Sequence, residues 1–238
     1  MSFNNTLFSI VYIRMMEHLT SWWIQWVIAL CLVLVSAYFV ARATRKQRSD
    51  NLVLLLGPSG AGKTSLFYHW ALENPVQTIA SQTPNRGTVL QGCTKEIVDY
   101  PGHPKLQTGG LNLIPHASRI VYLVDASCPV ENLKLVAENI YDILVHKGLR
   151  GRMLIASNKS DLPKARSIAE LESVINSEIE SLRKSRTQEL EGESNDNYLG
   201  VDEESFDIAK HAPIQVSFTS CSVKKKSVTK IEEFIRIT

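Results

Sequence analysis

The stretch 52–64, LVLLLGPSGAGKT, decides the fold of this chain. An apolar run that ends at Gly-Pro is typical of a buried parallel strand, and the residues after it match G-x-x-x-x-G-K-[ST], the phosphate-binding P-loop. In such a loop the backbone N–H groups wrap the phosphates, the lysine reaches the β and γ oxygens, and the threonine hydroxyl ligates Mg²⁺. A plain glycine-rich turn is the alternative, which the strand–loop–helix context disfavours. The predicted nucleotide contacts are Gly57, Pro58, Ser59, Gly60, Ala61, Gly62, Lys63, Thr64 and Ser65.

A second motif, Asn158-Lys159-Ser160-Asp161, indicates which base is bound. It follows the apolar run 153–156, which we expect to be a strand. The Asp161 carboxylate would accept hydrogen bonds from N1–H and the 2-amino group of guanine, a donor pair that adenine lacks. Lys159 would pack along the nucleotide plane, and Asn158 would tie this loop to the P-loop. Behind a P-loop, this motif predicts GTP and argues against an ATP-using kinase or ATPase.

The segment Asp99-Tyr100-Pro101-Gly102-His103 lies between these two motifs, at the end of an expected strand. We expect Asp99 to hold Mg²⁺ through water and the Gly102 amide to meet the γ-phosphate. His103 stands where a water-orienting side chain is expected, which makes it the candidate catalytic residue. A simple Pro-Gly turn is the alternative, and the position between the two motifs disfavours it.

A hydroxyl from the loop 78–83 is expected to bind Mg²⁺ and the γ-phosphate. Ser81 is the preferred candidate, with Thr83 and Thr78 as rivals. The predicted metal ligands are therefore Thr64, Ser81 and Asp99.

The segment 220–224, after the last expected strand, is predicted to complete the base site. Its backbone N–H groups, from Ser222 and Val223, would face the guanine O6. Asp125 ends another expected strand, but the sequence offers it no nearby partner that would make it catalytic.

Alternating apolar strands and amphipathic helices predict a doubly wound, mostly parallel, six-stranded α/β sheet over residues 51–238. Strands are expected at 51–56, in two short pieces of 88–99 joined near Gly92, and at 120–124, 153–156 and 214–218. Helices are expected at 63–72, 131–147 and 228–237, together with a long amphipathic helix that begins at 168 and is marked by apolar residues as far as 182. The segment 188–207 has eight acidic residues and no basic ones, which predicts an acidic insertion loop.

Composition and charge exclude several classes of protein. The 238 residues include 26 Lys plus Arg and 24 Asp plus Glu, and the net charge is +2. The positive excess lies in residues 41–50, whereas residues 51–238 carry 21 basic and 22 acidic groups. A general nucleic-acid binder needs a broad basic face, so no direct nucleic-acid binding is expected. The four cysteines lie far apart without a C-x-x-C, which argues against a disulfide framework or a thiolate zinc site.

Residues 22–40 are uncharged and predominantly apolar, with tryptophans crowded at one end. A helix of that length spans about 28 Å, close to the thickness of a bilayer core, so a transmembrane helix is predicted. A cleavable signal peptide is the alternative, and it is disfavoured because the basic residues follow the apolar run. Positive flanks stay cytosolic, so we expect residues 1–21 to be lumenal and the basic linker 41–50 to be cytosolic.

With these five loops in order, the chain resembles a small Ras-like or Arf-like P-loop GTPase. The membrane anchor, D-x-P-G-H and the insertion before the last strand together are similar to the signal recognition particle receptor β-subunit family. The phrases that carry this resemblance are DYPGHPKL (99–106), LIASNKSDL (154–162) and ESLRKSRTQEL (180–190).

The resemblance implies a GTP-binding subunit that docks the receptor α subunit at the endoplasmic reticulum membrane for co-translational protein targeting. The loops around Ser81 and 102–106 would form the partner surface, and the bilayer and the ribosome or translocon are further candidate partners. Ser59, where rapidly cycling small GTPases commonly have Gly, and His103 in place of the usual Gln imply slow or partner-dependent hydrolysis. The alternative is a cycling Arf-like GTPase of vesicle trafficking, which usually leaves the membrane on hydrolysis.

Overall fold

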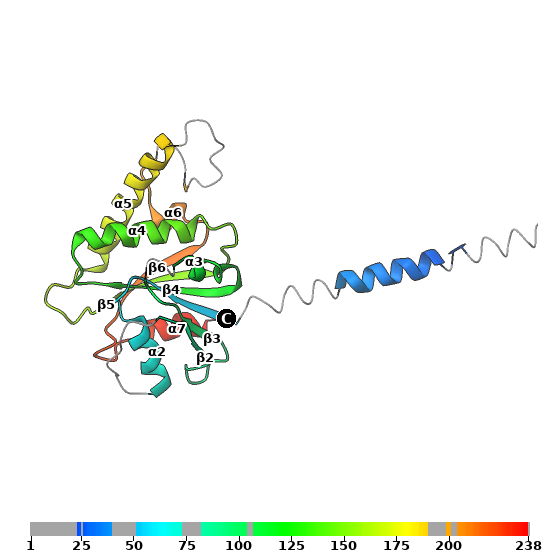
Figure 1. Ribbon diagram of the computed structural model, residues 1–238, viewed down its shortest axis with the longest axis horizontal. Helices are drawn as coiled ribbons and strands as arrows, with labels where there is room; N and C mark the ends of the chain where they lie inside the picture. Colours follow the sequence, from blue (N-terminus) through cyan, green and yellow to red (C-terminus); the bar gives the residue numbers. More distant parts are fainter. Residues whose placement is uncertain are drawn as a thin grey trace, which may run out of the picture. The chain divides into compact units, whose positions relative to one another are not determined.

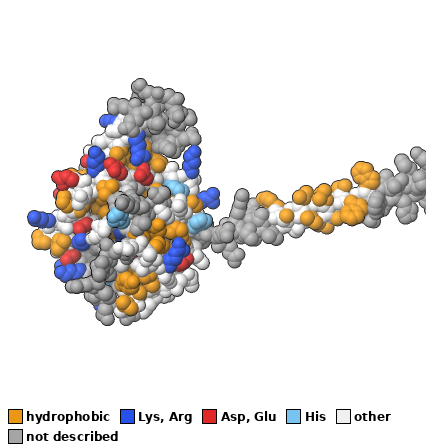
Figure 2. Space-filling model, in the orientation of Figure 1, with side chains coloured by type: hydrophobic (Ala, Val, Ile, Leu, Met, Phe, Trp, Pro, Cys, Tyr) orange, Lys and Arg blue, Asp and Glu red, His pale blue; other side chains and the backbone are white. Residues whose placement is uncertain are grey.

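The computed structural model describes residues 23–24, 26–39, 51–72, 82–103, 107–189, 199–200 and 204–237. The chain divides into two compact units, Met1–Arg48 and Ser49–Thr238. In the first unit the described residues are helical, and they present mostly hydrophobic side chains (Figure 2). Among the residues described, no helix combines the length and the apolarity needed to cross a membrane. The predicted segments 1–21, 22–40 and 41–50 lie wholly or partly outside this described part.

The second unit is built on a six-stranded sheet with the order β2-β3-β1-β4-β5-β6. Strand β2 runs antiparallel to β3, and every other neighbouring pair is parallel. The predicted mostly parallel six-stranded sheet is therefore confirmed. The strands are β1 (Leu52–Leu56), β2 (Asn85–Gly87), β3 (Glu96–Asp99), β4 (Ala117–Asp125), β5 (Arg152–Asn158) and β6 (Gln215–Ser220).

Helices cover both faces of this sheet, as a doubly wound fold requires (Figure 1). Helices α2 and α7 lie on one face, and α3 to α6 lie on the other. A 3₁₀ turn at Ile114–His116 leads into β4. The helices are α2 (Lys63–Leu72), α3 (Gln107–Leu111), α4 (Val130–Leu144), α5 (Ile168–Glu189), α6 (Ile208–His211) and α7 (Thr229–Arg236).

Each face of the sheet has its own hydrophobic core. Beneath α4 and α5 the core includes Ile140 and Ile175, and beneath α2 and α7 it includes Leu66 and Ile231, all four fully buried. Side chains that alternate along β1 enter both cores, which explains why this strand is apolar at every position. Full burial of one such aliphatic side chain contributes about 1.5–3 kcal/mol, so the layers are held chiefly by this packing.

Local sequence signals set several element boundaries. Helix α5 begins with a capping box, in which the Ser167 N–H donates to Glu170 Oε2 at 2.8 Å and the Glu170 N–H donates to Ser167 Oγ at 3.3 Å. The same helix extends to Glu189, past the last apolar position expected at 182 and into the first residues of the segment 188–207 predicted as a loop. An ion pair at 3.0 Å between Arg186 and Asp142 of α4 supports this extension.

The hairpin β2–β3 differs from the two strands predicted within 88–99. Its first strand is Asn85–Gly87, and residues 88–95 form the connection. Gly92 lies in this connection with a φ of 68°, which favours glycine in a turn. The apolar pair Val89-Leu90, which suggested a strand, instead contributes to the core under α2 and α7.

Candidate nucleotide-binding site

The predicted loops meet at one edge of the sheet. The P-loop follows β1, residues 99–103 begin at the end of β3, and the motif 158–161 begins at the end of β5. The segment 221–223 follows β6. Carboxyl ends of parallel strands share one edge, and in doubly wound sheets that edge is where ligands bind.

Two glycines give the P-loop its shape. Gly57 has a φ of 136°, and a Cβ on it would lie 2.2 Å from the Leu123 carbonyl oxygen of β4. Gly62 has a φ of 98°, and a Cβ on it would lie 2.2 Å from Asn158 Nδ2. Only glycine adopts such conformations readily and leaves room for these close approaches. The loop is thus held between β4 and the N-K-S-D segment, whereas Ser59 and Gly60 are exposed.

Lys63 opens α2, and its side chain turns back over the P-loop. Its Nζ donates to the carbonyl oxygens of Gly57 at 2.8 Å and Pro58 at 2.9 Å. Burial lowers the pKa of this ammonium to about 8, and the charge of Asp99 opposes that shift. Gly102 packs against the same place, because a Cβ on it would lie 2.6 Å from Lys63 Nζ. The two predicted phosphate contacts, Lys63 and Gly102, are therefore brought together.

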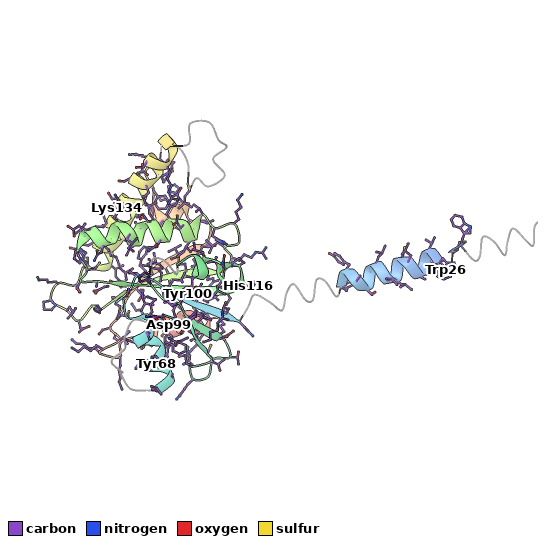
Figure 3. The ribbon with its side chains drawn as sticks, in the orientation of Figure 1. Trp26, Tyr68, Asp99, Tyr100, His116 and Lys134 are labelled. Carbon is purple, nitrogen blue, oxygen red and sulfur yellow. The ribbon has the colours of Figure 1, made fainter. Side chains whose placement is uncertain are left out.

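Asp99 ends β3 and is fully buried (Figure 3). Its Oδ2 accepts hydrogen bonds from Thr64 Oγ1 at 2.8 Å and from Asn85 Nδ2 at 2.9 Å. Burial raises the pKa of this carboxyl, while those two hydrogen bonds and the charge of Lys63 oppose the rise. Its Oδ1 is also buried, and it has no hydrogen-bond partner in the part of the chain that is described.

This environment fits a Mg²⁺ ion. Mg²⁺ takes oxygen ligands in an octahedron and is usually held by one or two carboxylates together with phosphates and water. The unpaired Oδ1 of Asp99 and the neighbouring Thr64 hydroxyl are ligands of that kind. The third predicted ligand, Ser81, lies outside the described residues, as does its rival Thr78. The other rival, Thr83, is described and exposed.

Asn85 belongs to this cluster, although sequence reasoning did not predict it. It opens β2 and stands directly opposite Asp99 in the antiparallel register, which brings its amide to the carboxylate. The signal that could have revealed it is the register of a three-residue strand, and that register is not visible in the sequence pattern.

Asn158 joins three loops through one buried amide. Its Nδ2 donates to the Ala61 carbonyl oxygen of the P-loop at 2.8 Å. Its Oδ1 accepts from the Val223 N–H at 3.1 Å, in the loop after β6. The distance between the phosphate-binding and base-binding loops is therefore fixed by two hydrogen bonds from one side chain.

Asp161 is held by the loop after β6. Its Oδ1 accepts a hydrogen bond from Ser222 Oγ at 2.6 Å, and Ser222 Oγ in turn accepts from the Lys225 N–H at 3.1 Å. The bond from Ser222 lowers the pKa of the Asp161 carboxyl, so it is an ionised acceptor at neutral pH. An isolated bridge between Ser222 and Ser227 closes this loop. The Asp161 carboxylate is thus held in one position at this edge of the sheet.

Lys159 forms an ion pair that the sequence reasoning missed. Its Nζ lies 2.5 Å from Asp125 Oδ2. Asp125 Oδ1 also accepts from the Ser127 N–H at 2.9 Å and from Ser127 Oγ at 2.7 Å. Although burial acts to raise the pKa of Asp125, the bonds from Lys159 and Ser127 outweigh it and lower that pKa. The sequence indicated no nearby partner that would make Asp125 catalytic; the structure shows an ion-pair partner for it, because β4 and β5 pair Asp125 with Asn158, the residue before Lys159.

The predicted catalytic residue, His103, is exposed and follows Gly102 directly. Ser65 lies within α2 and is half-buried. Ser81 lies outside the described residues. Every other residue predicted to contact the nucleotide or the metal lies in one of the loops at this edge or at the start of α2. The strand order and the P-loop, D-x-x-G and N-K-x-D segments at this edge define a small P-loop GTPase.

Comparisons with known proteins narrow this class to one family. The family model "Signal recognition particle receptor beta subunit" matches residues 48–218. Signal recognition particle receptor subunit beta of Homo sapiens is 30% identical over 215 residues, which are 83% of this chain and 77% of that protein. The chain belongs to the signal recognition particle receptor β-subunit family, and it is accordingly a GTPase subunit of that receptor.

Solved structures agree with this assignment. The structure of the mammalian SRP receptor matches with a TM-score of 0.68 and 26% identity, covering 78% of this chain and 98% of that chain. An SRb-GTP/SRX complex from Chaetomium thermophilum shares the fold, with a TM-score of 0.64 at 21% identity over 77% of this chain and 98% of that one. ADP-ribosylation factor K of Dictyostelium discoideum is a more distant relative, matched over 54% of this chain and 69% of its own length.

Proposed function

We propose that this edge of the sheet binds GTP with Mg²⁺, and that the subunit is a nucleotide-gated docking platform. The observation that carries the proposal is the hydrogen-bonded frame around Asn158 and Ser222. This frame holds the Asp161 carboxylate at a fixed place relative to the P-loop. A rigid acceptor at a set distance from a phosphate cradle is what selection of a guanine nucleotide requires.

Each part of the edge has a role in that proposal. Backbone N–H groups of the P-loop, from residues 59–62 and Gly57 but not from Pro58, bind the phosphates, and the Lys63 ammonium neutralises their charge. Thr64, Asp99 and Ser81 would hold Mg²⁺, which supplies charge neutralisation between the β and γ oxygens when bound. The Gly102 N–H meets only a γ-phosphate, so the loop containing it distinguishes GTP from GDP.

Slow or partner-dependent hydrolysis follows from the same edge. The exposed His103 stands where the usual Gln would orient the attacking water, and a histidine there typically orients water when a partner completes the site. Ser59 also stands at an exposed P-loop position. A site that binds the triphosphate and turns it over slowly keeps the GTP-bound loops ordered for long periods. Such a site suits a stable docking platform better than a GTPase that cycles rapidly between its GTP-bound and GDP-bound states.

The membrane anchor is part of this proposal. Residues 22–40 would span the endoplasmic reticulum membrane once, with residues 1–21 lumenal and the basic linker 41–50 and the GTPase unit cytosolic. The support is the uncharged apolar run followed by basic residues, and membership of a receptor family whose members serve targeting at that membrane.

The partner we propose is the receptor α subunit, bound in the GTP state through the loops around Ser81 and residues 102–106. The SRb-GTP/SRX complex supports a GTP-dependent partner for a protein of this fold. The lipid bilayer, and the ribosome or the translocon, are further proposed contacts. A cycling Arf-like switch is less well supported, because the Arf relative matches only about half of the chain.

An Asp161→Asn substitution tests the guanine assignment. The amide donates where the carboxylate accepts, so we expect weaker binding of GTP and stronger binding of xanthosine triphosphate, whose 2-carbonyl accepts. Affinities of the full chain in detergent for both nucleotides, measured by calorimetry, give the result. An Asp207→Asn variant is the control, since Asp207 caps α6 away from the edge. Unchanged GTP affinity in the Asp161 variant would show that this carboxylate does not read the base.

A further inference from the structure

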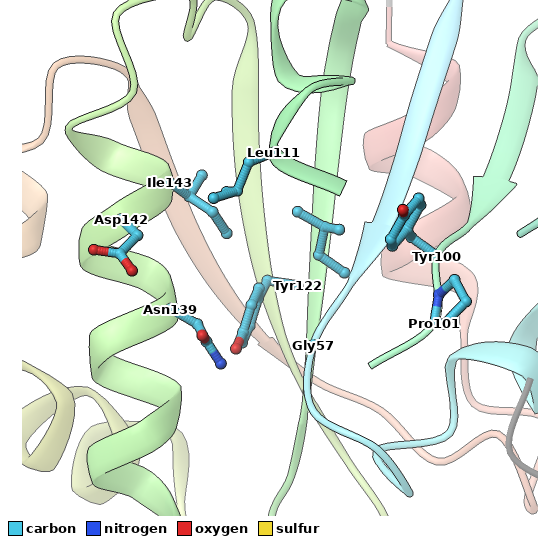
Figure 4. A pocket seen from close by; sticks show the side chains of 9 residues that line it. Gly57, Tyr100, Pro101, Leu111, Tyr122, Asn139, Asp142 and Ile143 are labelled. Atoms are coloured by element: carbon cyan, nitrogen blue, oxygen red, sulfur yellow. The ribbon is translucent and has the colours of Figure 1, made fainter. Parts of the chain in front are cut away.

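A small cavity lies between α4 and the segment that follows β3 (Figure 4). Its volume is about 50 Å³. Tyr100 and Pro101 form one side, and Tyr122 of β4 and Asn139 of α4 form the other. Gly57, the first residue of the P-loop, also lines it. The cavity therefore adjoins the proposed nucleotide site without containing any of its predicted side-chain ligands.

Two buried polar groups lie at the edge of this space and interact with each other. The Tyr122 hydroxyl and Asn139 Nδ2 are both buried, and the Asn139 side chain acts on the Tyr122 hydroxyl, but neither group makes a hydrogen bond of normal geometry to the residues described. Tyr122 is 1% exposed. Burial raises the pKa of its phenol and the neighbouring Asn139 side chain opposes the rise only in part, so the hydroxyl stays protonated and can both donate and accept. A buried donor left unpaired destabilises a fold, so these two groups call for an occupant that can hydrogen-bond.

We propose that the cavity is a binding site for ordered water, which couples α4 to the segment carrying Gly102. A water needs about 10–15 Å³ and two to four polar partners, so the cavity has room for about three waters. The Tyr122 hydroxyl and the Asn139 amide supply two partners at the inner end. Apolar walls from residues such as Leu111 and Ile143 limit where the water can lie.

The coupling follows from the chain's connectivity and rests on the proposed function. Tyr100 and Pro101 join Asp99 to Gly102, so the cavity wall is continuous with the groups proposed to meet Mg²⁺ and the γ-phosphate. Water bound against Tyr122 and Asn139 supports that wall in the position where the Gly102 N–H faces the phosphates. Tyr122 and Asn139 are thus positioning residues, which act on the nucleotide through residues 100–102.

Removal of each polar group tests this inference. Tyr122→Phe deletes the hydroxyl and keeps the ring, and Asn139→Leu replaces the amide by an apolar group of similar size. Tyr141→Phe is the matched control. Tyr141 is buried and lies on α4, the helix that carries Asn139, but it does not line the cavity. For each full-length variant in detergent, the urea midpoint and the dissociation constants of GTP and GDP are measured.

The water site predicts a lower urea midpoint for Tyr122→Phe, since a satisfied hydrogen bond is lost. It also predicts that Tyr122→Phe and Asn139→Leu each lower the preference for GTP over GDP about fivefold, the factor of one ordinary hydrogen bond. Tyr141→Phe should leave that preference unchanged. A raised midpoint for Tyr122→Phe would mean a dry cavity, and an unchanged preference would mean no coupling; either result overturns the inference. Failure of the parent chain to bind guanine nucleotides would instead refute the proposed function.

Discussion

At the scale of single residues, Asn158 shows how one side chain can organise a site. Its amide uses a donor toward Ala61 and an acceptor toward Val223, so loops from two distant parts of the chain share one anchor. The amide is also the reason that Gly62 must lack a Cβ, which would meet Asn158 Nδ2 at 2.2 Å. The sequences G-x-x-x-x-G-K-T and N-K-x-D are thus linked by direct contact.

The ion pair between Lys159 and Asp125 leads to a prediction at the same scale. Lys159 has a φ of 63°, and Asp125 holds its ammonium so that the aliphatic stem stays in one orientation. We expect Asp125→Ala to speed nucleotide dissociation about two- to fivefold, a modest factor because the pair is partly exposed. Release of a fluorescent GDP analogue from the full chain measures it.

Asp207→Ala is a suitable control for that measurement. Asp207 Oδ2 lies 3.8 Å from Lys210 Nζ, and Asp207 Oδ1 caps α6, so the substitution removes a charge, a weak ion pair and a helix cap away from the nucleotide edge. Equal dissociation rates for the parent chain and the Asp125 variant would show that the ion pair does not position Lys159 for binding.

Residues of the site were predictable from sequence where a motif fixes both spacing and chemistry. Lys63, Asp99 and Asn158 lie in such motifs, and the structure brings them to one edge of the sheet. Asn85 and Asp125 were missed because their roles depend on strand register, across β2–β3 for one and β4–β5 for the other. Register is set by tertiary pairing, so a single strand's sequence does not reveal it.

At the scale of elements, the shape of the P-loop requires glycine at certain positions, and this requirement can be tested. Gly57→Ala would place a Cβ 2.2 Å from the Leu123 carbonyl oxygen, in addition to the strain of a φ of 136°. Gly60→Ala would meet nothing within 4 Å and carries only the strain of its φ of 79°. We expect Gly60→Ala to lower the free energy of unfolding by about 1–2 kcal/mol, and Gly57→Ala to lower it by more.

Urea unfolding of the two glycine variants, with and without nucleotide, checks this order. The pair is well matched because both substitutions add the same methyl group to the same loop. Equal losses of stability would contradict the account, since they would mean that the contact with β4 does not constrain the P-loop.

Elements with a strong local pattern were predicted well, and short ones were not. Helix α2 has the predicted bounds, because the P-loop marks its start and Asn74-Pro75 follows its end. Helices α4 and α7 match within a few residues, because each has an amphipathic stripe. Helices α3 and α6 were not predicted, since at five and four residues they are too short to show a period. Strand β2 was predicted too late in the chain, because its residues, Asn85–Gly87, are polar or glycine, while the apolar pair Val89-Leu90 lies in the connection to β3.

At the scale of the whole molecule, the pattern of charge and hydropathy changes near residue 50, close to the boundary between the two compact units. The positive excess is confined to residues 41–50, whereas the unit from Ser49 onward has nearly equal numbers of acidic and basic groups. Figure 2 shows these charges interspersed over the visible face of that unit. Such a mixed surface is typical of a water-exposed domain, and the linker charge is the basis of the orientation proposed for the membrane anchor.

The measurement that tests the central claim most directly is identification of the nucleotide that the native protein carries. The full chain is purified in mild detergent with Mg²⁺, denatured, and the released nucleotide is separated by chromatography and quantified against protein. A GTP site with slow turnover predicts close to one guanine nucleotide per chain, with GTP present. Release of an adenine nucleotide, or of no nucleotide from a folded protein that also fails to take up added GTP, would contradict the account.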